Sequence, residues 1–314
     1  MSTLLISCRN NAAKMPKPEN GMTVFTLGGE KIKYDYVRYV YLNTKADMEY
    51  GEEDGYWENN ATAFDELKSS TLSTIAHNRA IEMLAEKYKL KLSEAEKKAV
   101  AKLLTETKKD KESWKEAKED YFLTEYSFSY LQRFSILWGK TYDHVTSPMS
   151  GIIKSDDETV LADIPINFRN IRYVYIEYDE KTKGEKSALA AEVLEKASSG
   201  EDFVKLINEY GEDTTMANFI NIGYYYTVGS INPAVEMETE KLKVGEISPI
   251  IDVKDGFFIV QRIDIDMEYA KKNVAVFLDY YLGRVFNEMV AEIQENMEME
   301  FSDFWNTLKI DDIK

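Results

Sequence analysis

The chain has 314 residues, of which 44% are hydrophobic and 30% are charged, so it is long enough for two globular domains and too apolar to be disordered throughout. Its 56 acidic residues exceed its 39 basic residues and leave a net charge of −17, which repels nucleic-acid backbones and anionic lipid headgroups. Two histidines and one cysteine are too few for a Cys/His zinc cluster or a disulfide framework, and no apolar run reaches the roughly 18 residues of a membrane-spanning helix.

The cysteine lies near the N-terminus, in the segment Leu5-Ile6-Ser7-Cys8. An aliphatic residue three positions before it and a small residue directly before it resemble the lipobox of bacterial lipoproteins, whose cysteine receives diacylglycerol. Residues 9–21 have the polar content of a solvated tether. A cysteine placed there by chance is the alternative, because a basic segment is missing and the apolar stretch is short. A leader lost from the N-terminus would account for both. We expect Cys8 to carry the lipid, residues 1–21 to be a signal remnant and tether, and this anchor to be the only contact with a membrane.

A hairpin and several amphipathic helices are expected next. Thr23–Leu27 and Glu30–Lys33 have the composition of two short strands, and the two glycines between them allow the positive φ of a tight turn. Helical spacing begins at Tyr34 and is interrupted by an acidic loop at about residues 49–60. Further helices are expected at about residues 62–88, from Ser93 onwards, around Trp114 and from Thr124 to Trp138. Residues 22–165 are therefore expected to form the N-terminal part of a helical domain.

Pro148 and Pro165 interrupt the helical pattern, and a different order of elements follows. Residues 167–266 alternate between strand-like and helical segments and end in a nearly continuous apolar run, which is typical of a central buried strand. We expect this segment to be a separate α/β domain. The helical period returns in residues 267–314, but this segment is too short to fold alone. It is expected to complete the helical domain, which makes the middle domain an insertion.

Five short pieces of the middle segment follow one another in a characteristic order. They are Gly200-Glu201-Asp202-Phe203 with Tyr210-Gly211-Glu212-Asp213, Gly223-Tyr224, Gly229-Ser230-Ile231-Asn232-Pro233, Leu242-Lys243-Val244-Gly245-Glu246-Ile247-Ser248 and Gly256-Phe257-Phe258-Ile259-Val260. This order resembles a parvulin-type peptidyl-prolyl isomerase over about residues 171–264. Two flanking pieces resemble foldases of the PrsA and SurA type, namely Gly28-Gly29-Glu30-Lys31-Ile32 and Lys91-Leu92-Ser93-Glu94-Ala95-Glu96.

The resemblance implies an α+β fold, in which a parvulin-like α/β domain with a four-stranded antiparallel sheet and helices is inserted in a helical, SurA-like chaperone domain. It also implies an extracytoplasmic protein, lipid-anchored to a bacterial membrane through Cys8, that assists unfolded or newly exported polypeptides. The net charge argues against nucleic acid as a partner. No cofactor and no metal are expected, because rotation about an X-Pro bond requires neither.

Isomerisation requires polar groups around the proline amide. An activation energy of about 20 kcal/mol opposes rotation about the X-Pro bond, so catalysis means stabilising the twisted amide of the transition state. The resemblance implies a cluster of two histidines and an aspartate or cysteine at this place. Tyr173 and Phe258 stand at the two histidine positions, and Asp213 matches the acidic position. Asp213 and Tyr173 are the candidate catalytic residues. The alternative is that Tyr173 and Phe258 only fill space and that Asp213 only caps a turn.

The resemblance further implies an apolar cup that holds the proline ring. Its positions are occupied by Ile222, Ile231 and Val235, which are apolar, although the last two are smaller than the usual methionine and phenylalanine. Together with Phe258 they form the candidate substrate-binding set.

Two functions remain open at this point. A lipid-anchored prolyl isomerase of weak activity is favoured by Asp213 and the apolar cup. A non-catalytic holdase chaperone that binds unfolded or proline-containing segments is favoured by the absence of both histidines. A purely structural envelope protein is a third and less attractive interpretation.

Overall fold

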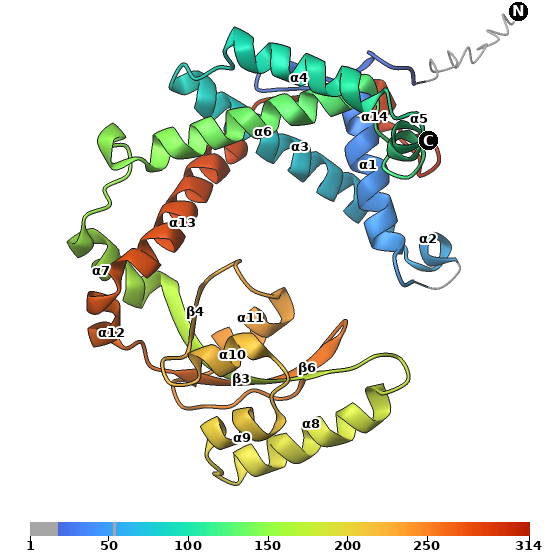
Figure 1. Cartoon of the computed structure of the whole chain (residues 1–314). Helices are drawn as coiled ribbons and strands as arrows, with labels where there is room; N and C mark the ends of the chain where they lie inside the picture. Colours follow the sequence, from blue (N-terminus) through green and yellow to red (C-terminus); the bar gives the residue numbers. More distant parts are fainter. Residues whose placement is uncertain (1–17, 53–54) are drawn as a thin grey trace, which may run out of the picture. The chain divides into compact units, whose positions relative to one another are not determined.

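The structure, a computed structural model, describes residues 18–52 and 55–314 (Figure 1). Cys8 lies outside these residues. Contacts within the chain group it into two units: one runs to Val145 and resumes at Phe286–Lys314, and the other comprises Thr146–Val285. The second unit is therefore continuous in sequence and interrupts the first. In the described part of the chain, no helix has both the length and the apolar character of a membrane span.

The first unit contains a three-stranded antiparallel sheet in the order β2-β1-β7. β1 (Thr23–Leu27) and β2 (Glu30–Lys33) form the expected hairpin, and the turn glycines Gly28 and Gly29 have φ values of +50° and +78°. β7 (Met299–Phe301) pairs with the other edge of β1. The hairpin is thus confirmed, whereas no pattern in the sequence predicts β7.

Helices form most of the first unit. Ser93 begins α4 through the expected capping box, in which its hydroxyl accepts a hydrogen bond from the backbone of Glu96 and the Glu96 carboxylate accepts one from Ser93. A buried tryptophan near the C-terminus, Trp305, packs edge-on against Phe25 of β1, with 5.1 Å between ring centroids. The helices are α1 (Tyr34–Glu49), α2 (Tyr56–Asn59), α3 (Ala63–Lys87), α4 (Glu94–Thr107), α5 (Lys111–Glu119), α6 (Glu125–Thr146) and α14 (Asp303–Asn306).

The second unit is built around a four-stranded antiparallel sheet in the order β4-β3-β6-β5. Its central strands pair from Asn170 opposite Ile263 to Glu177 opposite Gly256. The apolar run predicted to be a central buried strand is β6. These observations confirm the α+β fold class with its four-stranded antiparallel sheet. The strands are β3 (Phe168–Glu177), β4 (Tyr224–Thr227), β5 (Ile251–Val253) and β6 (Gly256–Ile263).

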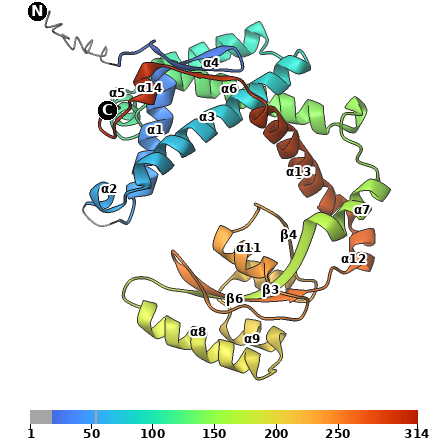
Figure 2. The same cartoon turned by 180° about the vertical axis from the view of Figure 1, so that it is seen from behind.

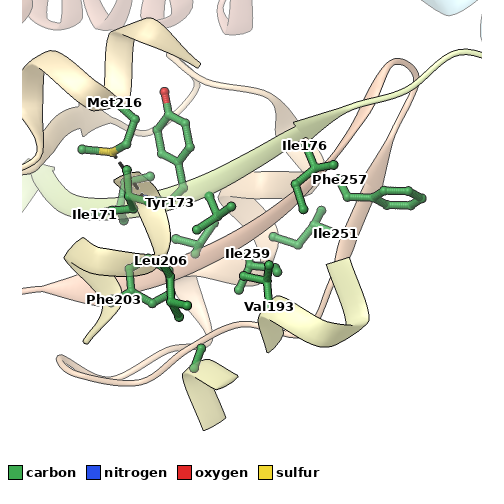
Figure 3. Close-up of a cluster of buried hydrophobic side chains, with 14 of the residues drawn as sticks. Ile171, Tyr173, Ile176, Val193, Phe203, Leu206, Met216, Ile251, Phe257 and Ile259 are labelled. Carbon is green, nitrogen blue, oxygen red and sulfur yellow. Dashed lines mark hydrogen bonds between the residues drawn. The ribbon is translucent and has the colours of Figure 1, made fainter. Parts of the chain in front are cut away.

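Helices cover both faces of this sheet. α8 (Lys183–Ser198) and α9 (Phe203–Tyr210) lie on one face, and α10 (Thr214–Phe219) and α11 (Pro233–Glu240) lie on the other (Figures 1 and 2). Figure 3 shows the buried side chains, with Val193 close to Ile259 on the first side and Met216 close to Tyr173 on the second. Both faces of the central strands are therefore buried, as their continuous apolar sequence requires.

Helical segments before and after the sheet belong to the same unit. They are the 3₁₀ turn η1 (Pro148–Ser150), α7 (Asp157–Asn167), α12 (Met267–Lys272) and the first part of α13 (Val274–Glu295). An ion pair joins Arg284 of α13 to Asp163 of α7, and Phe277 of α13 packs on Phe168 with 5.3 Å between ring centroids. These contacts tie residues 146–165 and 267–285 to the sheet, although the sequence pattern assigns them to the helical domain. The expected division into one helical domain of residues 22–165 with 267–314 and a separable domain of residues 167–266 stays a prediction.

Candidate functional site

A hydrogen bond joins the two candidate catalytic side chains. The hydroxyl of Tyr173, on central strand β3, donates to Oδ2 of Asp213 over 2.5 Å. Asp213 is the N-cap of α10, and its Oδ1 accepts a 2.7 Å hydrogen bond from the backbone of Thr215. Each oxygen of Asp213 therefore already has one donor, and the helix fixes the carboxylate in front of the Tyr173 ring.

The surroundings of Tyr173 keep its hydroxyl protonated. Burial raises the pKa of Tyr173, and the hydrogen bond to Asp213 and the negative charge of that carboxylate raise it further. The pair thus offers a neutral donor and a carboxylate acceptor. It does not contain an imidazole, the group that changes charge near neutral pH. Among the described residues, no group of three or more His, Cys, Asp or Glu side chains could hold a metal ion.

Aromatic rings surround this pair on the sheet. The ring of Phe258 on β6 lies 5.2 Å from that of Tyr173 and 4.7 Å from that of Tyr175, measured between centroids. Tyr224 of β4 meets Tyr173 edge-on at 6.2 Å. The two positions expected to hold histidines therefore carry rings in mutual contact, and Phe258 contributes no hydrogen-bonding group.

The three residues expected to form the proline cup have different surroundings. Val235 on α11 is buried in the core of the second unit, and Ile231 packs partly exposed against the same core. Ile222 is not part of that core and lines a cavity beside β4. Ile231 and Val235 thus pack against the same core, whereas Ile222 lies apart from that core among aromatic residues.

The cavity beside β4 has a volume of about 110 Å³. Residues on β4 and on the turn before it form one side, and residues on α12 and α13 form the other. The run of tyrosines at residues 224–226 is the sequence signal that could have indicated it, but α12 and α13 follow more than 40 residues later. The lining residues are Phe168, Phe219, Ile222, Gly223, Tyr224, Tyr225, Tyr269, Val276, Phe277 and Tyr280.

A buried asparagine holds the turn that carries Ile222. Nδ2 of Asn170, on β3, donates to the backbone oxygens of Ile222 and Asp264, each over 3.0 Å. Because buried polar groups need such partners, Asn170 fixes the turn against the end of β6. Nothing in the sequence pattern distinguishes this asparagine from a surface residue.

A larger groove lies in the first unit, between the loop before α4, α4 itself and α6. Its volume is about 580 Å³, and its apolar lining includes Leu92, Val100, Leu104 and Leu137, with the basic residues Lys97 and Arg133 beside them. A groove of this size and lining suits an apolar segment of a polypeptide. The helical stripes predicted from the sequence therefore line a groove as well as the core.

Comparisons with known proteins found relatives of parts of this chain. Residues 172–264 match the family described as the PPIC-type PPIASE domain. The chain is 25% identical over 180 residues to foldase protein PrsA of Geobacillus sp. (strain WCH70), a match that covers 52% of this chain and 59% of the relative. It is 31% identical over 144 residues to foldase protein PrsA of Geobacillus kaustophilus (strain HTA426), covering 43% and 45%. The chain thus spans about half the length of the curated relatives it matches.

A solved structure of the SurA-like chaperones of Campylobacter jejuni aligns over 90% of this chain and 99% of its own, with 11% identity and a TM-score of 0.33.

These findings confirm the resemblance to parvulin-type isomerases and PrsA foldases. The matched family segment contains every candidate catalytic and substrate-binding residue, from Tyr173 to Phe258. The roles of these residues stay predictions.

Proposed function

We propose that this chain is an extracytoplasmic foldase that assists unfolded or newly exported polypeptides, and that its parvulin-like domain is a weak peptidyl-prolyl isomerase. The family match and the PrsA relatives support this proposal. The observation that carries it is the hydrogen-bonded pair of Tyr173 and Asp213 beside Phe258, at the positions where the resemblance implies a polar cluster.

The weakness of the proposed activity follows from the chemistry of the pair. As an X-Pro amide twists, its nitrogen loses conjugation with the carbonyl group and gains a lone pair that can accept a hydrogen bond. Tyr173 is a donor, but its proton is already held by Asp213. Donation to the amide nitrogen therefore exchanges one hydrogen bond for another, and the net stabilisation of the transition state is small.

A non-catalytic holdase is the second candidate. Two observations favour it: Phe258 offers only an aromatic surface, and the groove between α4 and α6 is apolar. Binding by apolar contact needs no polar cluster, so a holdase would tolerate the loss of both histidines.

We further propose that Cys8 is lipidated and tethers the chain to the outer face of a bacterial membrane. A lipid-modified cysteine with two or three acyl chains anchors a protein stably, since each buried CH₂ contributes about 0.8 kcal/mol. Mass spectrometry of the native membrane fraction is expected to find a diacylglyceryl adduct on Cys8. An unmodified thiol in that fraction would contradict the anchor.

A protease-free isomerisation assay on short X-Pro peptides tests the enzymatic proposal with the full chain. Asp213→Asn keeps the helix cap but removes the charge, and it is expected to lower any isomerase activity while peptide binding persists. Asp202→Asn is the matched control, because Asp202 caps the neighbouring helix α9 in the same way. If only aggregation of unfolded clients is suppressed and no turnover is measured, the holdase is correct. If isomerase activity is strong and is unchanged by Asp213→Asn, Tyr173 and Asp213 do not take part in catalysis.

A further inference from the structure

The cavity beside β4 has the properties of a side-chain binding site. We propose that it binds a proline ring of the client polypeptide, separately from the core around Val235 where the cup was expected. This inference rests on the proposed function and adds to it the place of binding and the chemistry that is recognised.

The wall of the cavity is almost entirely aromatic. Seven of the ten residues that line it carry aromatic rings, and none of the ten is charged. Aromatic-lined grooves are the surfaces on which proline-rich segments dock, because the flat rings pack on the pyrrolidine and the segment is already extended before it binds. A charged side chain would find no opposite charge in this lining.

The rings hold one another in place. Tyr225 stacks on Tyr269 with 5.9 Å between centroids and an interplanar angle of 15°, and Phe277 meets Tyr225 edge-on at 5.1 Å. Phe168 in turn packs on Phe277. Because these side chains are already fixed, binding does not require their rotamers to be ordered, and less affinity is lost to entropy.

The size of the cavity suits a small ring. Its volume of about 110 Å³ is smaller than the roughly 150 Å³ of an engineered apolar protein cavity that takes up benzene. Entry is possible because Val276 is 52% exposed and Tyr280 is also exposed, both at the α13 side of the cavity. The cavity is therefore of a size that suits a small ring such as pyrrolidine.

Two tyrosine hydroxyls at the cavity complete the recognition of an X-Pro unit. Among the described residues, the hydroxyls of Tyr224 and Tyr280 have no hydrogen-bond partner, so both can donate to a ligand. Proline has no N–H, and the carbonyl oxygen preceding it is the acceptor that an X-Pro unit presents. Tyr224 also touches the ring of Tyr173, so its side chain borders both the cavity and the Tyr173–Asp213 pair.

Calorimetric titration of the full chain with short, terminally blocked peptides tests the inference. A peptide with one X-Pro unit is compared with the same peptide carrying alanine, pipecolic acid or lysine instead of proline. Val276→Arg places a charged side chain at the mouth of the cavity and is expected to weaken binding of the prolyl peptide at least about tenfold, since the ring would lose its apolar site. Val228→Arg is the matched control, because Val228 is 63% exposed in the same unit and does not line the cavity, and it should change affinity less than about twofold.

Each outcome decides one claim. We expect the prolyl peptide to bind more tightly than the alanyl, pipecolyl and lysyl peptides, and Val276→Arg to remove that preference. If the prolyl peptide binds and Val276→Arg behaves like Val228→Arg, the cavity is not the site, and the proposed function still stands. If a lysyl peptide binds more tightly, the chain does not prefer proline and the proline assignment is wrong. If the wild-type chain binds no peptide, both the inference and the proposed function fail.

Discussion

Asn170 and Gly223 approach each other so closely that a Cβ atom on Gly223 would stand 2.0 Å from Oδ1 of Asn170. Gly223 also has a φ of +83°, a conformation that residues with a side chain rarely adopt. The turn that carries Ile222 and Tyr224 to the aromatic cavity thus depends on a glycine facing a buried amide.

We expect Gly223→Ala to lower the free energy of unfolding by roughly 3 kcal/mol or more, because backbone strain of about 1–2 kcal/mol adds to a steric clash. Gly229→Ala is the control: its φ is +82° and no atom lies within 4 Å of the added Cβ. That variant should lose only the strain, about 1–2 kcal/mol, in urea unfolding followed by circular dichroism. If both variants lose the same free energy of unfolding, the Asn170 side chain can move away from the added methyl group without cost.

Glu82 gives the first unit a pH-dependent stability. Its carboxylate is largely buried on α3, where it accepts a 2.9 Å hydrogen bond from Tyr130 and pairs with Arg79. Burial raises the pKa of Glu82 above its ordinary value, and these partners offset only part of the rise. The native state therefore holds the proton more tightly than the unfolded state, and this contribution to stability is lost as the pH rises from about 4.5 through the native pKa.

The change Glu82→Gln should remove this dependence. Relative to the wild type, the free energy of unfolding of Glu82→Gln is expected to increase as the pH is raised from 4 to 7, as measured by urea unfolding at each pH. Glu86→Gln is the control, since Glu86 pairs with the same arginine but its side chain is 63% exposed, against 17% for Glu82. Parallel profiles for the wild type and Glu82→Gln would refute the assignment.

Restoring the two histidines should raise isomerase activity. The double substitution of Tyr173→His with Phe258→His places two imidazoles on rings that are already in contact, and it is expected to increase kcat/KM on X-Pro peptides at least about tenfold. Tyr175→His is the control, because Tyr175 also contacts Phe258 but does not occupy a histidine position of the family. No gain in the double variant would mean that other departures from the family limit the rate.

Trp305 should be a main contributor to the stability of the first unit. It is buried and packs on Phe25 of β1, so Trp305→Ala is expected to cost about 3–5 kcal/mol of unfolding free energy. Trp138→Ala removes an exposed tryptophan of α6 and should cost about 1 kcal/mol or less in the same urea titration. Similar losses in the two variants would exclude the C-terminal segment as part of this core.

Local patterns in the sequence were sufficient to predict much of the fold. The turn glycines of the hairpin, the Ser93 capping box and the apolar run of β6 all act through near neighbours in the chain. β7 could not be predicted in this way, because its three residues are exposed and it becomes a strand only by pairing with β1.

The candidate site was less accessible to sequence reasoning. Tyr173 and Asp213 could be brought together only through the family resemblance, since 40 positions separate them and neither is unusual locally. The surroundings of Ile222 could not be foreseen, because Phe277 and Tyr280 of α13 line the cavity. The sequence pattern assigns α13 to the helical domain and not to the domain that contains Ile222.

The pairing of β1 with β7 has a consequence for synthesis of the chain. A ribosome releases residues 23–33 long before residues 299–301, so the hairpin first emerges with one edge of β1 unpaired. An isolated hairpin is marginally stable in water, and an open strand edge can recruit another extended chain. The second unit, residues 146–285, lies between these two partners in the sequence. On a growing polypeptide, the sheet β2-β1-β7 therefore cannot be completed until residues 299–301 have been added and are free to pair.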